Sequence, residues 1–243
     1  SLLFGFVFGK PLINLLRRRQ GRGQPIRSDG PEGHQSKAGT PTMGGALILG
    51  ALVVSTLLWA RLDNMHIWVV LFVTIGFGAI GFADDYAKVS KQTSAGVPGR
   101  VRLGLGFVIA LIAALVAAQL HPEGLRLQVA VPVLKDALVP FGIVFFPFAM
   151  IVIVGTANAV NLTDGLDGLA VMPVMIAAAA LGVLAYAVGR VDFTQYLDVH
   201  YVPGTGELVI FGTALICAGL GFFWSLPPAA ALFLVHAGRT SRV

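Results

Sequence analysis

The sequence has 243 residues, of which 56% are hydrophobic and only 12% are charged, and its mean hydropathy is +0.81. Soluble domains are about 45–50% apolar and roughly 25% charged, so this composition leaves too little polar surface for a water-soluble globule. It excludes a soluble enzyme and a disordered protein, and the one cysteine, Cys217, excludes a disulfide scaffold. We therefore expect an integral membrane protein, in which the formal net charge of +5 reports where the loops lie rather than a nucleic-acid partner.

Long uncharged apolar runs predict an all-α, polytopic transmembrane helix bundle with about seven spanning helices in this chain. A helix needs about 20 largely apolar residues to cross the hydrocarbon core. Six runs are complete: Met43–Ala60, Ile67–Ala83, Leu103–Leu120, Ala137–Ala157, Leu169–Val188 and Leu208–Trp224. Because the runs are continuous rather than alternating, strands are not expected. Glycines inside the runs, including Gly76, Gly78, Gly219 and Gly221, suit close approach between helices.

The two ends of the sequence differ from the complete runs. The first run, Leu2–Leu16, contains a lysine and a proline and starts at Ser1, so we interpret it as a seventh spanning helix that has lost its beginning. The last run, Leu226–Val235, is too short to span. We expect a single transmembrane domain over residues 1–243, with a divergent or truncated tail at 225–243.

Lysine and arginine are distributed unevenly between the two sides that these runs define. Twelve lie in the gaps at residues 17–42 and 84–102 and in the tail, against four in the other gaps. The positive-inside rule therefore places those gaps, the gap after Ala157 and the tail in the cytoplasm. The same rule places the polar loops of this multi-pass protein on the cytoplasmic side.

An aspartate pair, Asp84 and Asp85, follows the second complete run. Adjacent carboxylates repel each other, and the nearby lipid raises the cost of their charge. Lys88, one helical turn later, is one partner that would offset this cost. Mg²⁺ with phosphate oxygens is another, since Mg²⁺ binds one or two carboxylates together with phosphates. The residues alone leave both interpretations open.

A second polar cluster occupies Asn158–Gly168. Asp164 and Asp167 are three residues apart, which places both carboxylates on one side of a turn or helix start. Asn158 and Asn161 repeat that spacing, and the glycines after each aspartate let backbone approach a ligand. One residue here would serve as a helix cap, but a single cap does not need so many polar groups, so we expect a functional loop.

A third cluster is basic and rich in hydroxyls and glycine. Lys37, Thr40 and Thr42 precede Gly44 and Gly45 at the start of a predicted helix, and helix N-termini bind phosphate. The order of residues is not that of a Walker motif. Two acidic clusters and one basic cluster on one cytoplasmic face of a lipid-embedded bundle indicate phosphoryl transfer between a nucleotide-type donor and a membrane acceptor.

The motifs resemble a known family. The stretches Gly30–Gly45, Gly81–Lys88, Asn158–Leu169 and Tyr201–Leu208 are similar to those of the bacterial phospho-N-acetylmuramoyl-pentapeptide transferases, a branch of the polyprenyl-phosphate N-acetylhexosamine-1-phosphate transferases. The likeness extends from about residue 1 to Trp224. It implies a fold with ten spanning helices, of which this chain holds the N-terminal part, and a homodimer.

The resemblance also implies an activity. Phospho-MurNAc-pentapeptide would pass from UDP-MurNAc-pentapeptide to undecaprenyl phosphate, a membrane lipid, giving lipid I and UMP with Mg²⁺ as cofactor. The residues carried over fall into two sets. Asp84, Asp85 and Asp164 would be catalytic and candidate metal ligands, with Asp84 proposed as the base for the lipid phosphate. Lys37, Thr42, Lys88, Asn158, Asn161, Gly165, Leu166 and Asp167 would bind substrate.

The tail departs from the family pattern. His236 stands where the family has an aspartate that binds Mg²⁺, and imidazole is a poor ligand for that hard cation. We therefore expect this chain alone to be inactive. Two alternatives to the transferase stay open: a related transferase with another sugar donor, and a lipid or nucleotide-sugar transporter. A transporter would place ionisable groups near the midplane, whereas the six complete runs carry no charged residue.

Overall fold

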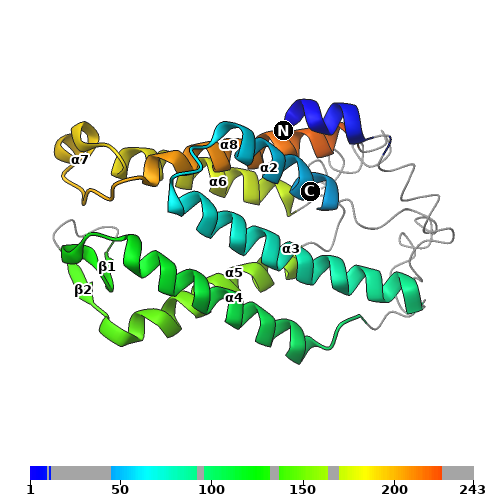
Figure 1. Cartoon of the computed structure of the whole chain (residues 1–243), viewed down its shortest axis with the longest axis horizontal. Helices are drawn as coiled ribbons and strands as arrows, with labels where there is room; N and C mark the ends of the chain where they lie inside the picture. The colour runs from blue at the N-terminus through cyan, green and yellow to red at the C-terminus, as the bar shows by residue number, and fades with distance from the viewer. Residues whose placement is uncertain (10, 12–44, 92–95, 132–136, 164–169, 226–243) are drawn as a thin grey trace, which may run out of the picture.

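The computed structural model describes residues 1–9, 11, 45–91, 96–131, 137–163 and 170–225 (Figure 1). Residues 2–9 are helical and are followed, after a gap, by α2 (Gly45–Trp59), α3 (Met65–Lys91), α4 (Gly99–Leu120), α5 (Phe145–Thr163), α6 (Val171–Val188), α7 (Val191–Leu197) and α8 (Leu208–Ser225). Short 3₁₀ turns occur at Glu123–Leu125, Gly142–Val144 and Thr205–Glu207. The predicted all-α polytopic bundle is confirmed.

The helices form two groups. In the first, α8 packs against both α2 and α6, and in the second, α4 lies between α3 and α5. Figure 1 shows that α3 begins near the end of α2 and runs alongside α4 toward the right of the view. Contacts between the groups are concentrated where α2, α8 and the Thr205–Glu207 turn meet α3.

Close packing within each group depends on glycine, as the sequence predicted. A Cβ atom at Gly76 would lie 2.8 Å from Ile109 Cδ1, so the Ile109 side chain of α4 packs directly against the α3 backbone there. A Cβ at Gly219 would lie 2.6 Å from Met175 Sδ, at the contact of α8 with α6. Outward positions such as Ile176 and Val183 stay exposed, which a lipid environment requires and water would penalise.

The number of spanning helices is lower than predicted. Five helices of the described residues are long and apolar enough to cross a membrane, namely α3, α4, α5, α6 and α8, whereas the sequence suggested about seven. The described α2 has 15 residues, which at 1.5 Å per residue is shorter than the hydrocarbon core. Most of the first run lies outside the described residues. The chain is a multi-pass membrane protein with five such helices in its described part.

The expectation of no strands was wrong at one place. Strands β1 (Gln128–Ala130) and β2 (Leu138–Pro140) pair antiparallel between α4 and α5. The predicted helix from Ala137 begins only at Phe145, because Pro140 ends the strand and Gly142, with φ +52°, turns the chain. Hydrophobicity alone cannot distinguish such a short apolar strand from the start of a helix.

Candidate active-site cleft

Asp84 and Asp85 lie within α3 and not in a loop after it, because α3 continues to Lys91. The apolar run ends at Ala83, whereas α3 continues for about two more turns. Lys88 explains the extension, since its ammonium lies four residues from Asp84 and three from Asp85 on the same helix face. The predicted lysine partner is therefore confirmed.

The Asp84 carboxylate is engaged at both oxygens. Lys88 Nζ lies 2.6 Å from Oδ2, and the backbone N–H of Val97 donates a 2.8 Å hydrogen bond to Oδ1. The residue is buried, with 7% of its surface exposed. Asp84 is thus a fixed negative charge, held from two sides.

Asp85 has a different environment although it is the next residue. Its Oδ1 lies 4.0 Å from Lys88 Nζ, and its side chain is 39% exposed against 10% for Asp84. Of the two carboxylates, Asp85 is the one that solvent or a ligand can reach.

Asn158 and Asn161 face the aspartate pair from α5. The sequence placed them in a loop, but α5 stays helical to Thr163. The Asn158 side chain donates a 2.8 Å hydrogen bond to the Val154 carbonyl one turn earlier, which uses one of the two N–H donors of its amide. The three-residue spacing then presents both asparagines along one side of the helix end.

These residues line one cavity of about 400 Å³ between α3, α4 and α5. Its polar lining consists of Asp84, Asp85, Lys88, Arg102, Asn158 and Asn161, and its floor is formed by Phe77, Ile80, Gly81, Gly106, Val154 and Ala157. The structure therefore brings together two of the three motifs that the sequence singled out. The cleft carries two cations, two carboxylates and two amides above an apolar floor.

Arg102 is a site residue that sequence reasoning missed. It lies in the first turn of α4, and its Nε is buried without a hydrogen-bond partner among the described residues. A buried donor without a partner is costly, which an anionic ligand would relieve. The sequence signal was only one arginine among the basic residues of that gap, so nothing distinguished it.

Other predicted site residues lie outside the described residues. They are Lys37, Thr42, Asp164, Gly165, Leu166 and Asp167, and His236 of the tail lies outside as well. Their roles remain those that the resemblance implies.

The donors in the cleft suit Mg²⁺ and not a transition metal. Among the described residues no group of three or more His, Cys, Asp or Glu side chains could hold a metal ion. Mg²⁺ needs no such cage, because it binds through one or two carboxylates, waters and the phosphates of a substrate. Asp85, with its accessible carboxylate, and Asp84 beside it fit that requirement.

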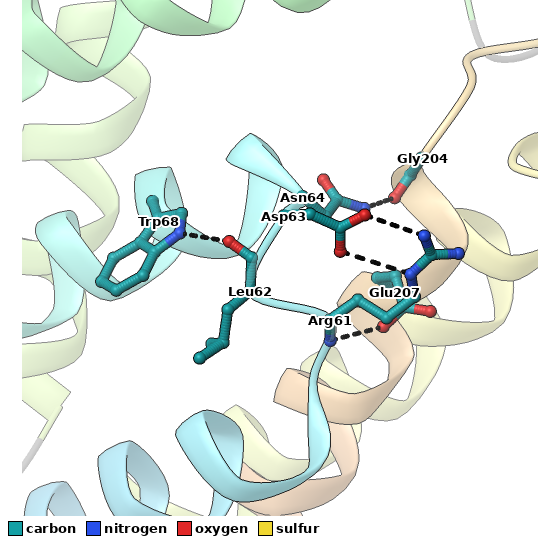
Figure 2. Close-up of polar contacts among 7 residues, drawn as sticks. All are labelled: Arg61, Leu62, Asp63, Asn64, Trp68, Gly204 and Glu207. Carbon is teal, nitrogen blue, oxygen red and sulfur yellow. Dashed lines mark hydrogen bonds and ion pairs between the residues drawn. The ribbon is translucent and has the colours of Figure 1, made fainter.

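The opposite end of α3 carries a second polar cluster (Figure 2). Asn64 Nδ2 donates a 2.7 Å hydrogen bond to the Gly204 carbonyl, and Glu207 accepts one of 3.2 Å from the Arg61 backbone N–H. Gly204 has φ +85°, a conformation that favours glycine. Glu207 therefore joins the turn before α8 to the turn between α2 and α3.

In the same cluster the Arg61 guanidinium hydrogen-bonds Asp63 through Nε and Nη2 at 3.3 and 2.8 Å. This contact lowers the pKa of the Asp63 carboxyl below its usual range. We call the contacts of Arg61, Asp63, Asn64, Gly204 and Glu207 the turn clasp. It joins the α2–α3 turn to the turn before α8, at the end of α3 away from the cleft.

Comparison with known proteins shows which family the sequence matches. The family model "Glycosyl transferase family 4" matches residues 67–238, and "Phospho-N-acetylmuramoyl-pentapeptide-transferase signature 1" matches residues 37–49, which include Lys37 and Thr42. A phospho-N-acetylmuramoyl-pentapeptide-transferase of Ruegeria pomeroyi is 68% identical over 238 residues, covering 98% of this chain and 66% of the relative. One of Maricaulis maris is 57% identical over 247 residues, covering 99% of this chain and 67% of the relative.

The chain thus spans about two thirds of the length of the curated relatives that it matches. The family model covers well over half of the chain and includes α3, α4 and α5, the three helices that form the cleft. The chain therefore belongs to glycosyl transferase family 4, among the relatives of phospho-N-acetylmuramoyl-pentapeptide-transferases.

Proposed function

We propose that the protein transfers phospho-MurNAc-pentapeptide from UDP-MurNAc-pentapeptide to undecaprenyl phosphate, releasing UMP and forming lipid I. The observation that carries this proposal is the cleft, in which Lys88, Arg102 and two aspartates meet at the polar end of apolar helices. The names of the relatives indicate the same reaction. Phosphoryl transfer depends mainly on positioning and charge stabilisation, and the cleft offers both.

Each described residue has a role that its contacts support. Arg102 and Lys88 would bind phosphate oxygens, since the Arg102 Nε lacks a partner among the described residues. Asn158 and Asn161 would bind polar groups of the nucleotide sugar. Asp84 and Asp85 would hold Mg²⁺, which neutralises charge on the phosphates when bound. One carboxylate would also accept the proton of the lipid phosphate, and Asp85 is the more accessible.

We further propose that the cleft faces the cytoplasm, because lysine and arginine are concentrated at that end. The membrane would be a bacterial inner membrane, as the resemblance implies. A cytoplasmic cleft would meet a soluble nucleotide sugar and a membrane-anchored acceptor from the same side. We also propose that the protein forms a homodimer, as the resemblance implies.

The test is Mg²⁺-dependent release of UMP. The assay would use this chain and a chimera that joins residues 1–224 to the part of the Ruegeria pomeroyi relative that follows its counterpart of Trp224, with both substrates in detergent. Formation of a radiolabelled lipid product by the chimera is the expected result. Equal turnover with UDP-N-acetylglucosamine would favour the related transferase. In a separate assay with the chimera in vesicles, uptake of the donor without a lipid product would favour a transporter.

A further inference from the structure

Residues 96–98, directly before α4, lie against Asp84 of α3. The Val97 N–H reaches across 13 residues of sequence to Asp84 Oδ1, at 2.8 Å. Pro98 follows directly, and its carbonyl accepts the N–H groups of Val101 and Arg102, at 2.9 and 3.1 Å, as α4 begins. One short turn therefore touches Asp84 and also starts the helix that carries Arg102 into the cleft.

Gly96 makes this approach possible. A Cβ atom at position 96 would come into severe overlap with Asp84 Oδ1, and would lie 2.8 Å from Asp84 Cγ and 2.8 Å from Lys88 Cε. Real Cβ atoms essentially never approach other atoms below 3.0 Å. The space beside Asp84 therefore accepts a backbone without a side chain, which is a use specific to glycine.

The contacts leave the Asp84 carboxylate little freedom. Lys88 holds Oδ2 and Val97 holds Oδ1, so the carboxyl group cannot turn without breaking a charge-assisted hydrogen bond. Among the described residues, Asp85 has no comparable contact, since its distance to Lys88 is 4.0 Å. The two carboxylates are thus divided into one that is fixed and one that is accessible.

We propose that Gly96 is a positioning residue for the cleft: by admitting the Val97 amide, it fixes Asp84 and Lys88 and leaves Asp85 as the more accessible of the two carboxylates. The catalytic meaning of this inference rests on the proposed transferase function. Its steric part does not, because the overlap at position 96 exists whatever the reaction is.

A double-mutant cycle on thermal unfolding tests the steric part. Gly96→Ala should lower the Tm of the 243-residue chain in detergent by at least about 3 °C. In an Asp84→Ala background the same change should cost little, because the obstructing carboxylate is gone and the flexible Lys88 side chain can move away. Gly99→Ala is the matched control, since a Cβ there meets nothing within 4 Å.

Each outcome of the double-mutant cycle either supports or overturns the inference. If Gly96→Ala fails to fold and the double variant folds, the inference stands. If Gly96→Ala costs the same with and without the Asp84 side chain, or no more than Gly99→Ala, the inference is overturned.

Turnover in the chimera tests the positioning role. Displacement of a reacting group by about 1 Å can cost about 100-fold in rate, so Gly96→Ala should lower kcat per folded enzyme at least tenfold while KM for the nucleotide sugar changes less than about threefold. Adding Gly96→Ala to Asp84→Ala should bring no further loss. An unchanged kcat would overturn the role, whereas a wild-type chimera without activity would count against the proposed function and leave the Tm cycle decisive for the inference.

Discussion

Asp84 and Asp85 are adjacent in sequence, yet the structure predicts that removing their side chains will have different effects on stability. Asp84→Ala would break the 2.6 Å ion pair with Lys88 and leave the Val97 N–H without its acceptor. Of the contacts between described residues, Asp85→Ala would remove a 4.0 Å contact with the same lysine.

The contacts allow the magnitudes to be compared. A hydrogen bond to a charged group contributes about 1.5–3 kcal/mol, and an ion pair between mostly shielded partners contributes more than the 0–1 kcal/mol of a surface pair. The Asp84 and Lys88 side chains are 10% and 23% exposed, so we expect Asp84→Ala to lower the free energy of unfolding by about 3 kcal/mol. For Asp85→Ala, whose side chain is 39% exposed, we expect less than about 1 kcal/mol.

Thermal unfolding in detergent, followed by circular dichroism, measures this difference. At about 2–4 °C per kcal/mol for a chain of this size, Tm should fall by about 6–12 °C for Asp84→Ala and by less than about 4 °C for Asp85→Ala. Asp198→Asn is a control, because φ at this residue is +54° and asparagine tolerates that left-handed conformation. Equal shifts for the two aspartate variants, or a larger one for Asp85→Ala, would refute the assignment of Asp84 as the fixed carboxylate.

Three further predictions concern the rest of the molecule. Asn64→Ala removes the 2.7 Å hydrogen bond that joins the two turns of the clasp and should lower Tm by about 2–6 °C. An unchanged Tm would contradict this prediction. Arg61 lowers the pKa of Asp63, so the Tm advantage of wild type over Arg61→Gln should be present at neutral pH and shrink as the pH falls through the aspartate range; a widening gap would show that another interaction is involved. Cysteines replacing Ser90 and Asp198, in a background without the native cysteine, should react with an impermeant thiol reagent added outside cells only at position 198, and the reverse pattern would invert the proposed orientation.

The sequence predicted the helical class because an uncharged apolar run long enough to span lipid has few alternatives. It misplaced the ends of α3 and α5 for a physical reason. A run ends where apolar residues end, whereas backbone hydrogen bonds continue for as long as side chains support them. Lys88 supports α3 in this way, and the bond from Asn158 to Val154 supports α5.

Gly96 and Arg102 show what sequence reasoning alone could not reach. The aspartate pair and the asparagines were visible because charge and amide groups are rare beside apolar runs. Glycine is common in this chain, with 30 residues, and the meaning of position 96 depends on the carboxylate that lies against it. That carboxylate is 12 residues earlier in sequence, so the contact exists only once α3 and α4 have packed.

The position of the cleft along the helices bears on how a reaction could join lipid and water. α3 changes from apolar to charged residues at Ala83–Asp84, and α5 changes at Ala157–Asn158, so both helices become polar at the cleft. Below this level the cleft floor is apolar, and outward side chains such as Phe82 are exposed. A lipid phosphate sits at the same boundary, because its chains stay in hydrocarbon while its charge needs water or a cation. Under the proposed function, the acceptor would therefore reach Lys88 and Arg102 without leaving the membrane, and the nucleotide sugar would arrive from the aqueous side. The ion pair with Asp84 keeps the Lys88 ammonium in place when no substrate is bound.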